Sequence, residues 1–135
     1  MKRLDPMLAA HPAPAHSDRA AAEECIIACA ECAAVCSSCA DACLAEGDVP
    51  GLVTCVRLNL DCADICALTG RLFARPSERH EETLRHQLEA CAAICEACAE
   101  ECGHHASHMA HCRICADACR RCAAACERML GALVP

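Results

Sequence analysis

Cysteines recur at intervals of three and four residues through most of this 135-residue chain. The densest stretch, CIIACAECAAVCSSCADAC from Cys25 to Cys43, carries six cysteines at gaps of four, three, four, three and four. Residues three and four apart lie on the same face of an α-helix, whereas other short intervals do not. The spacing therefore predicts a helix that presents one continuous stripe of sulfur.

The same interval returns in three further sets, so all 18 cysteines follow a helical period. One larger interval, from Cys55 to Cys62, is seven residues, which equals about two helical turns. The sequence thus predicts four helices that each carry a sulfur stripe. The four sets are Cys25, Cys29, Cys32, Cys36, Cys39 and Cys43; Cys55, Cys62 and Cys66; Cys91, Cys95, Cys98 and Cys102; and Cys112, Cys115, Cys119, Cys122 and Cys126.

Capping and turn residues divide the chain into a tail, residues 1–16, and a helical domain, residues 17–135. The tail is rich in Ala, Pro and His, and we predict that it is mobile, with Leu4 to Ala10 able to form a short helical turn. The four predicted helices run from a Ser17 or Asp18 cap to Glu46 before Gly47; from Asp48 to about Arg75 before Pro76; from a Ser77 cap to Gly103; and from a start within HHASHMAH, with Ser107 as a candidate cap, to about Gly131.

Short connections between long helices force neighbouring helices to run antiparallel. The predicted fold is therefore all-α, an antiparallel up-down-up-down four-helix bundle with a cysteine-lined core. Composition agrees, because apolar residues make up 56% of the chain and aromatic residues only 1%, which leaves a core built largely of alanine and cysteine. Charged residues such as Glu31, Asp61, Glu96 and Asp117 fall off the stripes and are expected to face water.

Charge and the N-terminal sequence exclude several partners and locations. The formal net charge of −7 provides no basic surface for nucleic acid or for an anionic membrane. The N-terminal stretch is interrupted by Asp5, Pro6, Pro12 and Pro14, which is not typical of a signal peptide, and the sequence predicts no membrane span. We therefore expect a cytoplasmic protein whose thiols stay reduced.

The function of 18 cysteines is best explained by a soft metal ion. Leucine would pack such a core better, and an S–S bond between cysteines three or four apart would strain the helix. The patterns typical of zinc sites and of ferredoxin iron–sulfur clusters do not occur. Cu(I) prefers thiolate and accepts two or three sulfur ligands, so a CxxxC pair such as Cys25 with Cys29 can span one ion without breaking the helix.

Charge balance indicates how many ions the core can hold. Buried thiolates need neutralising cations, and monovalent Cu(I) does so at about one ion per cysteine, or roughly 18 ions per chain. Many ions per chain are typical of storage or buffering. The sequence contains no nucleophile with a dedicated base and no glycine-rich phosphate loop, so we predict that the protein is not an enzyme.

CxxxC pairs repeated along four cysteine-lined helices, without an export signal, resemble the cytosolic branch of the bacterial copper storage proteins. The resemblance covers about residues 17–131. It implies a preformed bundle that binds many Cu(I) ions, with all 18 cysteines as ligands, and it implies a homotetramer. One departure is the second helix, where Asn59 and Thr69 occupy stripe positions that could have carried cysteine, so this region is expected to bind fewer ions.

The antiparallel order predicts two different ends. An open, polar end gathers Cys43, Asp48, Cys55, Cys102 and Cys112, whereas the opposite, closed end gathers Leu72, Phe73, Leu84, Leu88, Met129 and Leu130. Four histidines lie beside the open end, and we predict that they catch an ion and pass it inward; the alternative is that they are exposed loop residues. They are His104, His105, His108 and His111, of which His108 extends the stripe in either helical phase. We assign no role to His80 and His86.

Two other functions remain open from the sequence. One is a general thiolate buffer for zinc or cadmium, as in metallothioneins, and the other is a thiol redox reservoir. Metallothioneins order around their metal, whereas this chain has enough helical pattern to fold empty. Storage also implies exchange of copper with a donor or acceptor, either a protein or a small thiol.

Overall fold

The computed structural model describes residues 1–13 and 18–133, which are helical apart from turns and connections. The elements, in chain order, are α1 (Leu4–Ala10), α2 (Arg19–Leu44), a 3-10 turn η1 (Pro50–Leu52), α3 (Val53–Phe73), α4 (Glu81–Gly103) and α5 (Ala110–Ala132). The predicted Ser17 cap lies outside the described residues, as do the last residues of the predicted tail and of the predicted helical domain.

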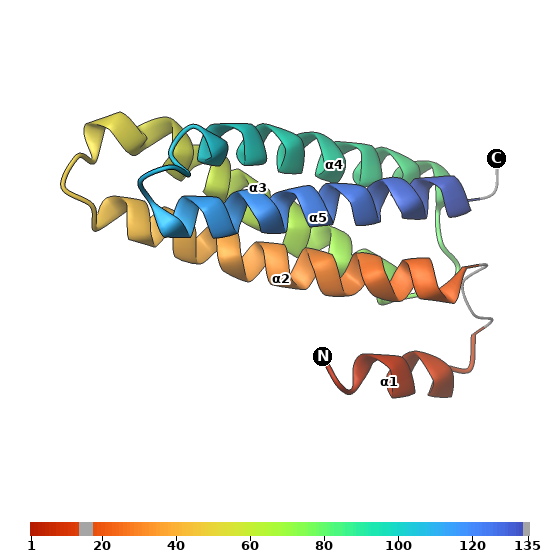
Figure 1. The fold of residues 1–135 in the computed structure, drawn as a ribbon. Helices are drawn as coiled ribbons and strands as arrows, with labels where there is room; N and C mark the ends of the chain where they lie inside the picture. The colour runs from red at the N-terminus through yellow and green to blue at the C-terminus, as the bar shows by residue number, and fades with distance from the viewer. Residues whose placement is uncertain (14–17, 134–135) are drawn as a thin grey trace.

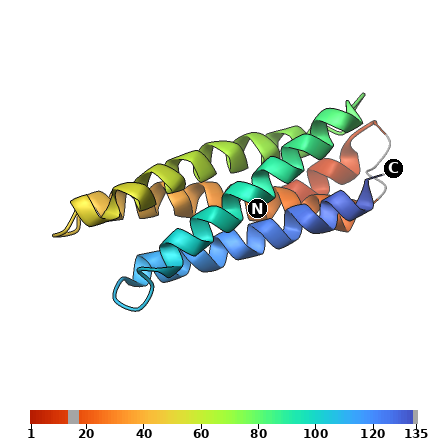
Figure 2. The ribbon, with the colours of Figure 1, turned by 90° about the horizontal axis from the view of Figure 1, so that it is seen from above.

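The four long helices form an up-down-up-down bundle, which confirms the predicted fold class. Each helix packs against the next in the chain, and α5 packs back against α2, so the helices enclose a common interior. Figures 1 and 2 show the α2–α3 and α4–α5 connections at one end of the bundle, which is the open end. The α3–α4 connection and the end of α5 lie at the other, the closed end.

Capping residues explain several helix boundaries. The Asp18 carboxylate accepts a hydrogen bond from the Ala21 N–H at 2.9 Å and so begins α2. At the other end of the bundle α4 ends at Gly103, as predicted. Helix α2 ends at Leu44, two residues before the predicted Glu46.

Two predicted helix starts and one candidate cap were wrong, each for a local reason. Ser77 does not cap α4, because Glu78 adopts a left-handed φ of 45° that interrupts the helix; α4 begins at Glu81, and the His80 ring nitrogen accepts the N–H of Thr83. Pro50 begins a 3-10 turn, so α3 starts at Val53 without an Asp48 cap. Helix α5 starts at Ala110, within the predicted HHASHMAH segment, but Met109 precedes it in an extended conformation and Ser107 is not its cap.

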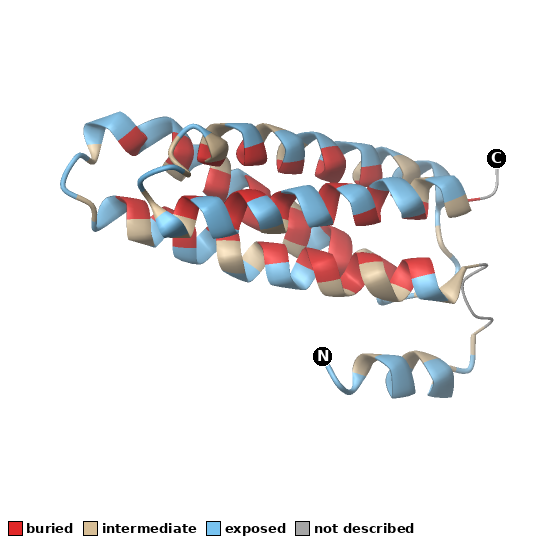
Figure 3. Ribbon diagram, viewed as in Figure 1, coloured by how far each residue is buried: buried red, intermediate tan, exposed pale blue. Residues whose placement is uncertain are grey.

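The core is made of cysteine and alanine, with larger apolar residues at the closed end. All 18 cysteines are buried, and Figure 3 shows the buried positions turned inward on each long helix. Phe73, Leu84, Leu88 and Met129 fill the closed end and are also buried. The sulfur stripes therefore share one interior that is sealed by hydrocarbon on one side.

Helix α2 is apolar because of this core. By length and composition, the helix Arg19–Leu44 could cross a membrane, because an 18-residue stretch of it has a mean hydropathy of 1.5. From the sequence we predicted no membrane span for this helix. Its cysteines face the bundle interior, and Arg121 and Arg128 of α5 pair with Glu31 and Glu24 on its outer surface. The same high hydropathy is found in core helices of bundles.

The N-terminal segment contains a helix that contacts the bundle. Leu4 and Leu8 of α1 are partly buried against the core residues, and the Arg19 guanidinium donates to the Asp5 carboxylate at 2.5 Å. Figure 1 shows α1 outside the four-helix bundle. The predicted mobility of residues 1–16 stays a prediction.

Candidate metal centre

The cysteines of the four long helices form a continuous column of sulfur atoms. Cys36 Sγ lies 3.5 Å from Cys119 Sγ and 3.7 Å from Cys115 Sγ, both across the bundle on α5. On the other side, Cys66 Sγ of α3 lies 3.5 Å from Cys95 Sγ of α4. These distances are far longer than the roughly 2.05 Å of a disulfide bond, and all 18 cysteines are free.

Within this column the thiols fall into groups of four whose sulfur atoms all lie within 4.8 Å of one another. Cys32, Cys36, Cys119 and Cys122 each belong to two of these groups, so the groups join end to end. Neighbouring ions in such an arrangement can share a thiolate. The groups are Cys29, Cys91, Cys122 and Cys126; Cys32, Cys66, Cys95 and Cys122; Cys32, Cys36, Cys62 and Cys119; and Cys36, Cys98, Cys115 and Cys119.

The remaining cysteines extend the column toward both ends. At the open end, Cys55 Sγ lies 3.6 Å from Cys102 Sγ and 3.9 Å from Cys43 Sγ. At the closed end, Cys25 is fully buried, and Cys29 and Cys126 share one group of four with Cys91 and Cys122. The structure therefore brings all 18 predicted ligands into one interior.

Burial keeps the thiols of Cys43 and Cys112, near the open end, protonated. Desolvation raises the pKa of Cys43 to about 12, and repulsion from neighbouring sulfurs, first that of Cys55, adds to the shift. Desolvation likewise raises the pKa of Cys112 to about 11. These thiols are neutral at neutral pH, so a bound metal ion must displace their protons.

Two polar residues of α3 occupy the stripe positions that lack sulfur. Asn59 and Thr69 are fully buried, yet both are hydrogen-bonded. The Asn59 amide donates to the Cys55 carbonyl oxygen at 2.8 Å and accepts from the Cys115 thiol at 2.9 Å. Thr69 donates to the Ile65 carbonyl oxygen and accepts from the Gln87 amide at 2.9 Å. Both side chains are thus satisfied without a metal ion.

The open end holds a pocket of about 340 Å³ with mixed polar and apolar walls. His105, His108 and Met109 contribute imidazole and thioether donors to it, and Glu46 and Asp48 contribute carboxylates. His108 is exposed, because the chain between α4 and α5 turns and does not extend the helical stripe. Its Nδ1 atom contacts the Ser107 hydroxyl. Its predicted stripe position was therefore wrong, although it does line the pocket.

His111 is the histidine that the structure places against the thiols. Its Nδ1 atom lies 3.4 Å from Cys39 Sγ and 3.6 Å from Cys112 Sγ. With Cys43, these three residues form a group of four donors within 4.8 Å. The other two histidines face a carboxylate of α4, with His105 Nε2 at 3.0 Å and His104 Nδ1 at 3.8 Å from Glu101.

The carboxylates that face these histidines were not found from the sequence. Glu101 and His105 are four residues apart, a spacing that could have indicated their pairing on α4. Glu46 Oε2 lies 2.9 Å from His111 Nε2, but these residues are 65 positions apart, Glu46 in the α2–α3 connection and His111 at the start of α5. Sequence spacing carries no signal for this second contact.

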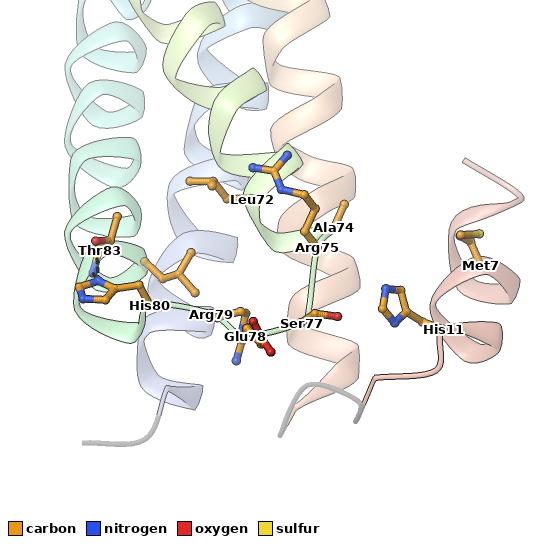
Figure 4. A pocket seen from close by; sticks show the side chains of 11 residues that line it. Met7, His11, Leu72, Ala74, Arg75, Ser77, Glu78, Arg79, His80 and Thr83 are labelled. Carbon is orange, nitrogen blue, oxygen red and sulfur yellow. Dashed lines mark hydrogen bonds between the residues drawn. The ribbon is translucent and has the colours of Figure 1, made fainter.

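A larger pocket lies outside the closed end, and Figure 4 shows its lining. It has a volume of about 570 Å³ and is formed by α1, the end of α3 and the α3–α4 connection. Its histidines are occupied locally, since His80 Nδ1 contacts Thr83 and His11 Nδ1 accepts the Ala13 N–H. The described lining contains no cysteine, so this pocket is separate from the sulfur column.

Comparison with known proteins gives the same picture. The sequence matches the family Csp, copper storage protein, over residues 18–131. The copper storage protein Ccsp from Streptomyces lividans, in a structure loaded with 10 copper equivalents, is 42% identical; the alignment covers 96% of this chain and 99% of that one, with a TM-score of 0.94. No curated protein sequence matches this chain.

Two structures of a Bacillus protein are also similar. The Cu(I)-bound copper storage protein BsCsp3 is 40% identical over 82% of this chain and 98% of its own, with a TM-score of 0.72. Apo-Csp3 from Bacillus subtilis is 40% identical over 80% of this chain and 97% of its own, with a TM-score of 0.68.

Fold and site together define a class of protein, the helical bundle that encloses a column of metal-binding thiols. The family match covers most of this bundle, and the relatives align along nearly their whole length. This chain belongs to the copper storage protein family.

Proposed function

We propose that this protein stores copper in the cytoplasm by holding many Cu(I) ions on its inward thiolates. The column of linked four-thiol groups carries the proposal, because it offers many equivalent soft donors and no single distinct site. Cu(I) is satisfied by two or three of these sulfurs, so a shared thiolate can bridge adjacent ions. The repetition and full burial of the donors favour storage over catalysis.

The charge of the core sets the expected capacity. Each bound Cu(I) replaces about one thiol proton, so a filled core of 18 thiolates needs about 18 ions for neutrality. A divalent ion would reach the same balance at about half that number. All 18 cysteines are therefore assigned as ligands, and Asn59 and Thr69 leave two stripe positions without one.

Ions are proposed to enter at the open end. His111 is assigned as a ligand together with Cys39, Cys43 and Cys112, because its Nδ1 atom faces their sulfurs. The remaining three histidines, His104, His105 and His108, lie further out and act as transient donors. At the closed end Phe73, Leu84 and Leu88 contribute only hydrocarbon and Met129 a single thioether.

The protein is also proposed to form a homo-oligomer, a tetramer by family resemblance, and to exchange copper with a donor or acceptor protein or a small thiol. Val53, Leu60 and Leu68 leave large apolar side chains exposed on α3, as an association surface does. Light scattering tests the assembly: a tetramer has four times the 14.2 kDa chain mass. A single-chain mass at micromolar concentration would contradict it.

Metal competition separates copper storage from the two other functions. Reduced protein is incubated with Cu(I) and an excess of Zn²⁺, and the retained metals are measured by elemental analysis after gel filtration. Retention of copper with little zinc supports the proposal. Retention of zinc in place of copper would favour a general thiolate buffer, and retention of neither would favour a redox reservoir.

A further inference from the structure

His111 contacts two different environments through its two ring nitrogens. Nδ1 lies 3.4 Å from Cys39 Sγ and 3.6 Å from Cys112 Sγ, inside the column. Nε2 lies 2.9 Å from Glu46 Oε2, on the outer side. An ionised carboxylate only accepts hydrogen bonds, so the proton of a neutral His111 ring sits on Nε2. The lone pair of Nδ1 is thereby directed at the thiols.

Glu46 is held where it can make this contact. It follows the end of α2, and its backbone N–H donates to the Cys43 carbonyl oxygen at 3.2 Å. His111 is the second residue of α5, so its backbone is fixed by the first helical turn. The Glu46 and His111 side chains are 37% and 28% exposed, so water competes only partly for their hydrogen bond. The contact joins the α2–α3 connection to the start of α5.

A second glutamate–histidine pair at the same end provides a comparison. Glu101 Oε2 lies 3.0 Å from His105 Nε2, and these side chains are 19% and 17% exposed. The Glu101–His105 pair lies at the C-terminal end of α4, and its two residues are four positions apart. His105 belongs to none of the four-donor groups given above. The two pairs therefore match in chemistry and both are partly buried, but only the Glu46–His111 pair is shown to face the sulfur column.

We propose that Glu46 is a positioning residue for copper uptake, whose carboxylate fixes the His111 ring so that Nδ1 offers its lone pair to an ion at Cys39, Cys43 and Cys112. The inference rests on the proposed function, because it assigns the first inward step of the ion. Metal-ligating histidines commonly donate their second ring N–H to a carboxylate, and loss of that partner lowers metal affinity or activity about 10-fold to 100-fold. Glu46 thus acts through His111 and does not itself bind the ion in the column.

The variant Glu46→Ala removes the acceptor, and Glu46→Gln keeps an oxygen that can accept from Nε2–H. Glu101→Ala is the matched control. We expect Glu46→Ala to slow Cu(I) uptake from a chelator about 10-fold, with Glu46→Gln close to the wild-type rate and Glu101→Ala within about twofold of it. Final capacity should be the same in all four proteins, since no thiol is changed.

A second measurement needs no copper. In the reduced, metal-free chain, ¹⁵N NMR reports which ring nitrogen of His111 carries the proton, at a pH about two units above the ordinary histidine pKa of about 6.5. We expect the Nε2–H tautomer in the wild type, in Glu46→Gln and in Glu101→Ala, and a mixture in Glu46→Ala. Circular dichroism of each variant shows whether the fold is retained. If Glu46 had only a structural role, Glu46→Ala would not change the His111 tautomer in a protein whose circular dichroism is unchanged.

The outcomes distinguish this inference from the proposed function. An unchanged tautomer or an unchanged uptake rate in Glu46→Ala overturns the positioning role while copper storage stands. Equal slowing of uptake in Glu46→Ala and Glu101→Ala also overturns it, because the effect would then come from surface charge. Failure of the wild-type protein to bind copper, with the Nε2–H tautomer present, overturns the proposed function.

Discussion

The amide oxygen of Asn59 accepts a hydrogen bond from the Cys115 thiol, with 2.9 Å between Oδ1 and Sγ. The Cys98 thiol approaches the same oxygen at 3.3 Å, and the amide nitrogen donates to the Cys55 carbonyl oxygen. Asn59 therefore joins three of the four long helices in the metal-free core. It does so at a stripe position where a cysteine would have supplied another ligand.

Replacing Asn59 by cysteine should add a ligand to the column. We expect Asn59→Cys to raise Cu(I) capacity by about one ion per chain, because each further thiolate needs about one more monovalent cation. Cu(I) titration of the reduced variant measures the change. Asn59→Leu is the control of similar volume and adds no sulfur, so a capacity above wild type in that variant would refute the explanation.

The metal-free, reduced protein should already be folded and strongly helical. Neutral thiols pack as small apolar groups, and Asn59 and Thr69 have hydrogen-bond partners without metal. Copper should then raise the unfolding temperature, because it binds the folded bundle in preference to the unfolded chain. Far-ultraviolet circular dichroism checks both expectations, and a random-coil spectrum for the metal-free chain would refute the preformed bundle.

Stability of the metal-free protein should fall at alkaline pH. Burial raises the pKa values of Cys43 and Cys112 to about 12 and about 11, above the ordinary value of 9.0, so between these values the folded chain holds protons that the unfolded chain has lost. The stabilisation is complete below about pH 9 and is lost as the pH rises through the folded-state values. Urea unfolding at pH 7 and pH 10 measures it. Equal stability at the two pH values would show that these thiols ionise normally in the fold.

The histidines of the open end should affect the rate of loading more than its extent. We expect His111→Ala to slow Cu(I) uptake more than the combined change of His104, His105 and His108 to alanine, because His111 forms a group of four donors with Cys39, Cys43 and Cys112. Capacity should fall by no more than a few ions in either variant, since the thiolates remain.

Two control variants accompany the comparison of His111→Ala with the triple histidine variant. His86 is exposed and faces Glu82 on the outside of α4, so His86→Ala should leave uptake unchanged. Cys39, Cys43 and Cys112 replaced together by serine should lower the capacity itself. Stopped-flow loading from a Cu(I) chelator measures all four variants, and wild-type uptake in His111→Ala would assign these histidines to the solvated surface.

The helical period of the cysteines was sufficient to predict the bundle and the burial of all 18 cysteines in it. An interval of three or four residues fixes the face of a helix, so every cysteine from Cys25 to Cys126 could be assigned to the interior. The closed end was also predictable, because Phe73 and Leu88 continue the same faces.

Local backbone geometry and contacts between distant residues could not be predicted in this way. The left-handed φ of Glu78 moved the start of α4, and the extended Met109 placed His108 outside the helix. The contact of Glu46 with His111 depends on how the α2–α3 connection meets the start of α5 at the open end, and no sequence interval indicates that. The sequence was least informative about the open end, where copper is proposed to enter.

The central claim is that the core is a store of many Cu(I) ions, and titration of the reduced chain with Cu(I) tests it most directly. Copper is added from a Cu(I) chelator of known affinity until the chelator begins to retain it, and bound copper is then measured per cysteine. With 18 buried thiols, we expect saturation near one ion per cysteine, or about 18 ions per chain. Saturation at about four ions or fewer would show a discrete metal site and contradict storage.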